Sequence, residues 1–141
     1  MKALITGASS GIGKDMAIYL SKCGFELIVC GRDKSKLEEL QSLLKTKVKV
    51  IIIDLADEKK AKDLYMVTKS ENVDVVINNA GIGYFSPILT IDLSQIQKVM
   101  NVNFIACYLI SKVVLKHMTK TKKQNSRLKS RIFIIYKEIL L

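Results

Sequence analysis

The chain has 141 residues, 49% of them apolar and 26% charged, which is typical of one folded globular domain rather than of a disordered chain. It contains no apolar run near the ~20 residues of a membrane helix, and the apolar run after Met1 is too short for a signal peptide. We therefore expect a cytoplasmic protein with no membrane partner. The net charge of +10 is uneven, because residues 119–131 carry six basic and no acidic side chains. This stretch favours a solvated basic loop over a nucleic-acid-binding domain.

Short β-branched runs alternate with helical periodicities over the first eighty residues. The runs are typical of buried strands and cover residues 2–6, 26–30, 48–53 and 73–78. Helices are predicted between them over residues 12–22, 35–44 and 58–69. Asp33 and Asp57 stand where the N-caps of the second and third helices are expected. The alternation predicts an α/β fold, a doubly wound parallel sheet with right-handed crossovers.

The rest of the chain is less regular. A loop over residues 79–91, which contains the only proline, leads to a long helix over residues 92–118. Apolar residues surround most of the circumference of this helix, so we expect it to be buried. The basic loop 119–131 follows, and then a candidate fifth strand at residues 132–136 within the tail 132–141. The sequence therefore predicts one domain over residues 1–118, with four to five strands in its sheet.

A glycine-rich turn, T-G-A-S-S-G-I-G, joins the first predicted strand to the first predicted helix. The pyrophosphate of a dinucleotide needs a backbone without obstructing Cβ atoms and the free N–H groups of a helix N-terminus. At this point of a doubly wound sheet the turn supplies both, and a tight turn without a ligand is the alternative. The pattern predicts a Rossmann-like nucleotide site with contacts from Gly7, Ser9, Ser10, Gly11, Ile12 and Gly13.

The spacing of these glycines resembles that of the short-chain dehydrogenases/reductases, whose signature is T-G-x-x-x-G-x-G. Three further signatures of that family follow in its order: Asp54-Leu55 after the third strand, N-N-A-G at residues 78–81, and Val102-Asn103 in the long helix. The resemblance covers residues 1–118. It implies a Rossmann fold and hydride transfer between a nicotinamide cofactor and a small-molecule carbonyl or alcohol. It also implies cofactor contacts from Asp54, Leu55, Asn79, Ala80 and Gly81.

The end of the second predicted strand indicates which nicotinamide cofactor to expect. NAD-specific members of the family usually place an acid there, which accepts hydrogen bonds from the ribose 2′-hydroxyl. Here Gly31 stands at that position, and the guanidinium of the next residue, Arg32, can pair with a 2′-phosphate. Asp33 is the alternative ribose-binding acid, since it lies twenty residues after Gly13, but we interpret it as a helix cap. We therefore expect NADP(H) as the cofactor rather than NAD(H).

Most of the family's catalytic residues have no counterpart in register. The family uses a serine at the end of the fifth strand, a tyrosine with a lysine four residues later, and an asparagine in the long helix that positions a water. The tyrosine needs the lysine because a free phenol has a pKa of ~10. Only Asn103 matches. The Y-x-x-x-K strings at residues 65–69 and 108–112 fall in helices that the resemblance places away from the nicotinamide, and we expect Tyr108 to be buried packing.

The segment after the long helix also departs from the family, which has a short glycine-containing turn there. We expect the residues from about Gln124 onward to be a truncated or out-of-frame ending of a longer reductase gene. Activity would then be impaired, and exposed apolar surface would favour association with a second copy. Two alternatives stay open: an enzyme that uses Tyr136 and Lys137 as substitutes, and a non-catalytic nucleotide- or polyanion-binding protein that uses residues 119–131. The three cysteines form no metal-ligand spacing, so no metal site is predicted.

Overall fold

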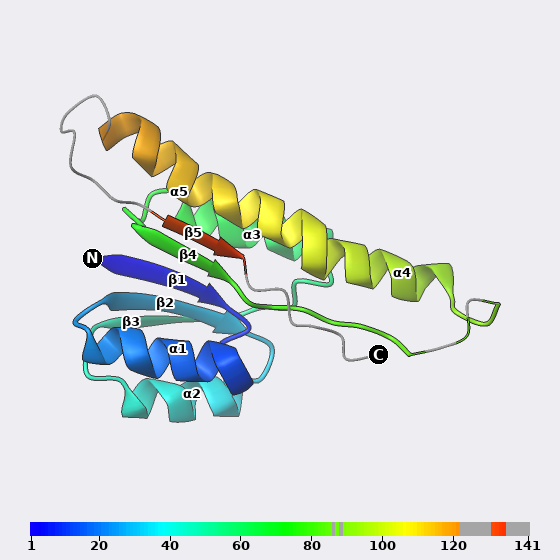
Figure 1. Ribbon diagram of the computed structural model, residues 1–141, viewed down its shortest axis with the longest axis horizontal. Coiled ribbons are helices and arrows are strands. Elements are labelled where there is room, and N and C mark those ends of the chain that lie inside the picture. Colours follow the sequence, from blue (N-terminus) through cyan, green and yellow to red (C-terminus); the bar gives the residue numbers. More distant parts are fainter. Residues whose placement is uncertain (86, 88, 122–130, 135–141) are drawn as a thin grey trace.

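The computed structural model describes residues 1–85, 87, 89–121 and 131–134. Within them a five-stranded parallel sheet has the order β3-β2-β1-β4-β5, and helices cover both of its faces (Figure 1). The strands are β1 (Lys2–Thr6), β2 (Glu26–Gly31), β3 (Val48–Ile52), β4 (Val75–Asn78) and β5 (Arg131–Ile134). The helices are α1 (Gly11–Lys22), α2 (Lys34–Leu43), α3 (Glu58–Thr68), α4 (Leu93–Met100), the π-helical segment η1 (Asn101–Ala106) and α5 (Cys107–Thr121). The predicted doubly wound, Rossmann-like α/β fold is confirmed.

Two separate hydrophobic cores lie on the two faces of the sheet. Ala3 and Ile5 pack with the buried residues of α1 and α2, whereas Leu4 and Val76 pack with those of α3 and α5. Successive side chains of a strand point to opposite faces. An unbroken apolar run is therefore what a strand needs when helices cover both faces.

Both predicted N-caps are confirmed. The Asp33 carboxylate accepts a hydrogen bond from the Lys36 backbone N–H at 3.1 Å, and that of Asp57 accepts one from the Lys59 backbone N–H at 2.8 Å. Because Asp33 starts α2 directly, only two residues separate the end of β2 from this helix. Arg32 is the other of the two, so its position at the edge of the sheet is fixed by a strand on one side and a helix on the other.

The long helix predicted over residues 92–118 is present as one run without a gap, but its middle segment has another helical type and its end lies later than expected. The structure has α4, the π-helical η1 and α5 in its place, and α5 continues to Thr121. Two asparagines of η1 bond to distant loops: Asn101 donates to the Ala56 carbonyl at 2.8 Å, and Asn103 bonds the backbone of Ile82. These long-range bonds coincide with the change of helical type, which local periodicity does not reveal.

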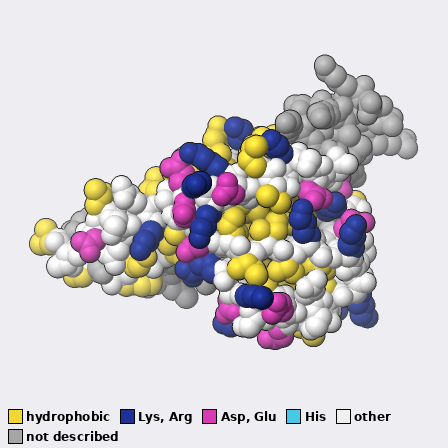
Figure 2. All heavy atoms as spheres, turned by 180° about the vertical axis from the view of Figure 1, so that it is seen from behind, with side chains coloured by type: hydrophobic (Ala, Val, Ile, Leu, Met, Phe, Trp, Pro, Cys, Tyr) yellow, Lys and Arg dark blue, Asp and Glu magenta, His cyan; other side chains and the backbone are white. Residues whose placement is uncertain are grey.

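The expectation that this helix is buried on most sides is also wrong. Its buried side chains recur every three or four residues and form one face, made by Val102, Ala106, Ile110 and Val113. The side chains of Phe104 and Tyr108 are 64% and 61% exposed. In Figure 1, α4 and the loop before it project beyond the sheet, and Figure 2 shows apolar side chains on the surface of this projecting arm. Apolar residues surround this helix, but the described elements cover only one of its faces.

The predicted fifth strand is confirmed as β5, which pairs in parallel with β4 and starts one residue earlier than expected. Tyr136 and Lys137 lie outside the described residues. So does most of the basic segment 119–131, and so do the residues from Gln124 to Ser130, where the altered ending was expected. Among the residues that the structure does describe, no helix combines the length and apolar character that a membrane span requires.

An ion-pair network ties the strands together at the amino-terminal edge of the sheet. The Glu71 carboxylate accepts hydrogen bonds from Nζ of Lys2 in β1 and Nζ of Lys49 in β3, both at 2.8 Å. The bond from Lys2, and then that from Lys49, lower the pKa of Glu71 to about 2. The folded state therefore favours the ionised carboxylate. Its stabilising effect is complete above the ordinary pKa of this carboxyl and is lost as the pH falls toward 2.

We predict that Glu71→Gln lowers the free energy of unfolding by about 1 kcal/mol at pH 7, a size that allows for the screening of ion pairs by solvent. The difference should shrink as the pH falls from about 5 and vanish near pH 2. Urea unfolding at several pH values measures it. Glu38→Gln is the matched control, because Glu38 has only an exposed pair with Lys34 at 3.7 Å. An equal loss in both variants would contradict a special role for Glu71.

Candidate nucleotide-binding site

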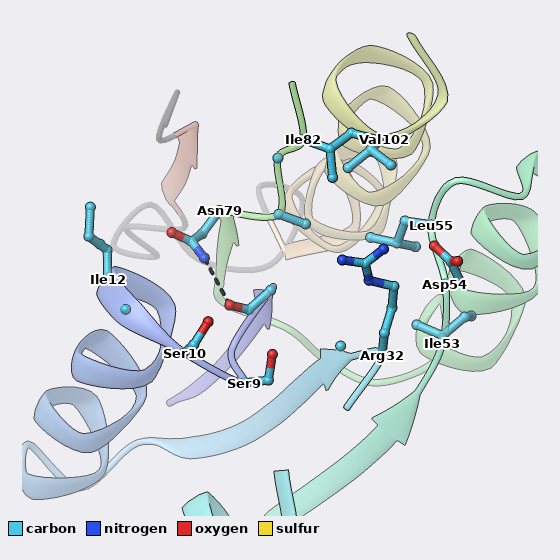
Figure 3. A pocket seen from close by; sticks show the side chains of 15 residues that line it. Ser9, Ser10, Ile12, Arg32, Ile53, Asp54, Leu55, Asn79, Ile82 and Val102 are labelled. Atoms are coloured by element: carbon cyan, nitrogen blue, oxygen red, sulfur yellow. Dashed lines mark hydrogen bonds between the residues drawn. The ribbon is translucent and has the colours of Figure 1, made fainter. Parts of the chain in front are cut away.

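A pocket of about 300 Å³ opens at the carboxyl-terminal edge of the sheet (Figure 3). It lies where β1 and β4 are neighbours, the point at which the strand order reverses. In open α/β sheets this is the usual place for a ligand. The pocket is lined by Gly7, Ser9, Ser10, Gly11, Ile12, Gly31, Arg32, Ile53, Asp54, Leu55, Asn79, Ala80, Gly81, Ile82 and Val102.

Eleven of the twelve residues predicted to contact a cofactor line this pocket, and the twelfth, Gly13, does not. Sequence reasoning missed Ile53, Ile82 and Val102 as lining residues. Ile82 directly follows N-N-A-G, and Val102 directly precedes Asn103. The N-N-A-G signature was therefore the available signal for Ile82, and the Val102-Asn103 signature was the signal for Val102.

The glycine-rich turn presents the N-terminus of α1 to the pocket. Gly7 and Gly11 have φ angles of 65° and 54°, which favour glycine. Ser10 is the N-cap of α1, its side chain makes no capping hydrogen bond, and the first turn contains no acidic residue. The N–H groups of that turn, with the positive end of the helix dipole, can therefore serve an anion.

Asn79 holds the turn in place from the end of β4. Its Nδ2 donates to the carbonyls of Thr6 at 3.1 Å and Gly7 at 3.0 Å. In return, Thr6 Oγ1 accepts the backbone N–H groups of Asn79 and Ala80, each at 3.0 Å. The Asn79 amide thus acts on the turn, although the residue also lines the pocket.

Gly13, in the first turn of α1, lies directly against the glycine-rich turn. A Cβ atom at this position would collide with Asn79 Nδ2 and would lie only 2.5 Å from the Gly7 carbonyl oxygen. Gly13 is buried and its backbone is ordinary helix. Its requirement for glycine is therefore the close approach of α1 to the turn, and not a contact with the pocket.

The end of β2 carries the only arginine that lines the pocket. Arg32 extends into the pocket toward the loop that carries Asp54 and Leu55 (Figure 3), and it makes no ion pair with any described residue. Cys30, two residues before Arg32, is buried, and burial raises the pKa of its thiol to about 12, so it adds no charge. The pocket therefore offers an unpaired cation in addition to the N-terminus of α1.

Asp33, the alternative ribose-binding acid, is used elsewhere. Its carboxylate accepts hydrogen bonds from the Lys36 N–H and from Ser35 Oγ at 2.9 Å. The hydrogen bond from Lys36, followed by that from Ser35, lowers the pKa of Asp33. It does not line the pocket. Our interpretation of Asp33 as a helix cap is therefore confirmed.

The loop after β3 forms the wall opposite the glycine-rich turn. Leu55 is buried and presents an apolar surface, and Ile53 lies beside it. The Asp54 carboxylate accepts the Ala56 backbone N–H at 3.0 Å, which fixes the loop. An apolar wall with one oriented carboxylate suits a flat, partly polar ring system.

Asn103, the one residue of the catalytic set in register, bonds to the loop after β4. Its Oδ1 accepts the Ile82 N–H at 3.0 Å, and its Nδ2 donates to the Ile82 carbonyl at 2.9 Å. Asn103 does not line the pocket, but Ile82 and the neighbouring Val102 do. The described role of its side chain is thus to hold a wall of the pocket.

Neither tyrosine of the two Y-x-x-x-K strings lines the pocket. Instead, Nζ of Lys112 lies over both rings, 5.7 Å from the centroid of Tyr65 and 5.5 Å from that of Tyr108. The expectation that Tyr108 is buried packing is wrong, because this tyrosine lies on the exposed face of α5. The three side chains form a surface contact between α3 and α5 away from the pocket.

The sequence model of a family described as short chain dehydrogenase matches residues 1–127. The very-long-chain 3-oxoacyl-CoA reductase of Vanderwaltozyma polyspora is 35% identical over 134 residues, covering 88% of this chain and 38% of that protein. The human protein of the same name is 30% identical over 129 residues, covering 86% of this chain and 41% of the human protein. The chain therefore spans less than half the length of these curated relatives.

Solved structures give the same result. The bulky-bulky ketone specific alcohol dehydrogenase from Comamonas testosteroni has a TM-score of 0.79 and 28% identity, over 84% of this chain and 50% of that one. A metagenomic short-chain oxidoreductase in complex with NADP has a TM-score of 0.80 and 26% identity, over 95% and 60%. A short-chain dehydrogenase from Sphingobium yanoikuyae in complex with NADPH has a TM-score of 0.79 and 25% identity, over 85% and 49%. The chain belongs to the short-chain dehydrogenase family of NAD(P)-binding oxidoreductases.

Proposed function

We propose that the pocket binds NADP(H) in preference to NAD(H). The observation that carries the proposal is the unpaired guanidinium of Arg32 in a pocket whose other end is the open N-terminus of α1. Two anion sites in one pocket suit a ligand with two separate phosphate groups. NADP(H) has a pyrophosphate and a 2′-phosphate, whereas NAD(H) has only the former.

The residues present fit the cofactor part by part. The N–H groups of the turn between Ser9 and Ile12 would hold the pyrophosphate, because the Ala8 N–H already donates to the Cys30 carbonyl at 3.1 Å. Arg32 would hold the 2′-phosphate. Asp54 and Leu55 would bound the adenine, with Ala80 and Gly81 beneath the dinucleotide. A bound NADPH supplies the hydride of the reaction. Two of the similar solved structures are complexes with NADPH or NADP, which supports the same choice here.

The reaction we propose for the protein is the family reaction, hydride transfer between NADPH and a small-molecule carbonyl or alcohol. For these 141 residues tested by themselves we propose strongly impaired activity. Their sequence has no serine and no Y-x-x-x-K in register, and the side chain of Asn103 bonds Ile82 rather than facing the pocket. We further propose a cytoplasmic location and association of copies through the exposed apolar face of α4 and α5, with neither membrane nor nucleic acid as partner.

We predict that the folded chain binds NADPH more tightly than NADH, and that Arg32→Ala removes most of the difference. The loss of NADPH affinity should be roughly ten- to hundredfold, the size of a charge-assisted hydrogen bond to a phosphate. The affinity for NADH should change little. Fluorescence titration with both dinucleotides measures this.

Lys34→Ala is the matched control for Arg32→Ala, because it removes a nearby cation that does not line the pocket and pairs with Glu38. It should leave both affinities close to those of the unchanged chain. Folded material that binds neither dinucleotide would refute the proposal, and equal affinity for both would refute the preference.

Two glycine substitutions should separate the effect of the turn on stability from its effect on NADPH binding. Gly13→Ala should lower the free energy of unfolding by about 2–3 kcal/mol, since its Cβ would meet backbone that cannot move away. Gly11→Ala should cost only about 1 kcal/mol, from the left-handed backbone, because a Cβ there meets nothing within 4 Å. It should nevertheless weaken NADPH binding roughly tenfold, because that Cβ enters the space proposed for the phosphates. Chemical unfolding and titration together measure both effects, and a fully stable Gly13→Ala variant would contradict the packing argument.

The 141-residue chain should not consume NADPH with a panel of ketones and aldehydes faster than the heat-inactivated chain does. The physical reason is the lack of a phenol with a depressed pKa beside the substrate carbonyl. The decrease in NADPH absorbance at substrate and cofactor saturation measures this. Turnover that is abolished by Tyr136→Phe would overturn the prediction and favour the alternative in which Tyr136 and Lys137 act as substitutes.

A further inference from the structure

The last residue of β2 faces a side chain of the glycine-rich turn. A Cβ atom built on Gly31 would lie 3.3 Å from Ser9 Oγ and 3.5 Å from Ser9 Cβ. Its next neighbour, Leu37 Cδ1, would be 3.6 Å away, which is an ordinary contact. Figure 3 shows Ser9 at the near end of the pocket, with its hydroxyl directed into it. The only close contact that a side chain at position 31 would make among these neighbours is therefore with the Ser9 hydroxyl, which can rotate.

The backbone of Gly31 gives no reason for a glycine. Gly31 pairs with Ile52 in the regular parallel ladder of β2 and β3, and its carbonyl accepts the Ile53 N–H at 2.8 Å. It is not among the glycines with a positive φ angle. Space around the missing side chain, rather than conformation, is the constraint at this position.

We propose that Ser9 is a second specificity-determining residue, because its side chain fills the space that an acidic side chain at position 31 would need. The inference rests on the proposed binding of NADP(H). A carboxylate at position 31 would either push the Ser9 hydroxyl aside or accept its proton in a hydrogen bond. In both cases the carboxylate is poorly placed for a ribose 2′-hydroxyl, and the Ser9 hydroxyl is withdrawn from the pocket.

This arrangement makes positions 9 and 31 a coupled pair. With Ser9 in place, an acid at position 31 repels the 2′-phosphate of NADP(H) without becoming a good acceptor for NAD(H). Ser9→Ala removes the atom at 3.3 Å and leaves only the Cβ contact at 3.5 Å, which is ordinary. A gain in NADH affinity therefore needs both substitutions, and their effects should not be additive.

The test is a set of dissociation constants for NADPH and NADH, measured on the full chain and on Gly31→Asp, Ser9→Ala and the double variant. Gly31→Asp should weaken NADPH binding at least tenfold and leave NADH binding within about threefold of the unchanged chain. The double variant should bind NADH about tenfold more tightly than Gly31→Asp does.

The matched control is Ser42→Ala combined with Gly31→Asp. Ser42 lies in α2, donates to the Glu39 carbonyl, does not line the pocket and is not among the nearest neighbours of a Cβ at position 31, so this variant should bind NADH as Gly31→Asp does. Equal gains in NADH affinity for Gly31→Asp and for the Ser9→Ala double variant would overturn the inference and leave the proposed function intact, as would an equal gain in the control. If the folded, unchanged chain binds neither dinucleotide, the proposed function fails and this inference fails with it.

A second pair of variants covers the case in which Gly31→Asp does not fold. Gly31→Ala introduces only the Cβ atom, so its effect on the thermal midpoint reports the same contact without a charge. The midpoint should fall by more degrees in the presence of Ser9 than in a Ser9→Ala background. An equal fall in both backgrounds would overturn the inference.

Discussion

The site depends on the hydrogen bonds that join Thr6, at the end of β1, to Asn79, just beyond the end of β4. Thr6 Oγ1 accepts two backbone N–H groups, and Asn79 Nδ2 returns two hydrogen bonds to the carbonyls of Thr6 and Gly7. The carbonyl side of the glycine-rich turn is thereby engaged with protein. Of its N–H groups, that of Ala8 donates to the Cys30 carbonyl at 3.1 Å, and those from Ser9 onward face the N-terminus of α1. The helix α1 can approach the turn this closely only because Gly13 has no side chain.

The loop after β4 is held by amide side chains from several directions. Asn78 and Asn79 are consecutive, so their side chains point to opposite sides of the sheet. Asn78, which is buried, donates to Ser111 Oγ in α5 at 3.0 Å, whereas Asn79 reaches the glycine-rich turn. Further along the same loop, the backbone N–H and carbonyl of Ile82 both bond to the side chain of Asn103 in η1. The N-N-A-G signature and the asparagine of the long helix thus position one wall of the pocket relative to both layers of helices.

The elements governed by local chemistry could be predicted from the sequence, and those governed by tertiary contacts could not. The glycine-rich turn, the cap at Asp33 and the buried strands follow from residue types at close spacing. The π-helical segment within the long helix coincides with bonds from Asn103 to a residue 21 positions away. The periodicity of apolar residues does not encode such a long-range bond. The exposure of Tyr108 could not be predicted, because the residue types on each side of a helix show how apolar that side is, but not whether another element covers it. The binding roles of the pocket residues stay predictions.

The charge of the site is decided by where α2 begins. Arg32 and Asp33 are adjacent and of opposite sign, so a ligand near both would meet little net charge. The start of α2 separates them, because the orphan N–H groups of its first turn engage the Asp33 carboxylate. Of these two charges only the guanidinium lines the pocket, where the other charged residue is Asp54, whose carboxylate accepts the Ala56 N–H. A helix that began one residue later would release this acid toward the edge of the sheet, and the same sequence would then present a carboxylate where we propose that a 2′-phosphate binds. The proposed preference for a 2′-phosphate therefore depends on helix capping as much as on the arginine itself.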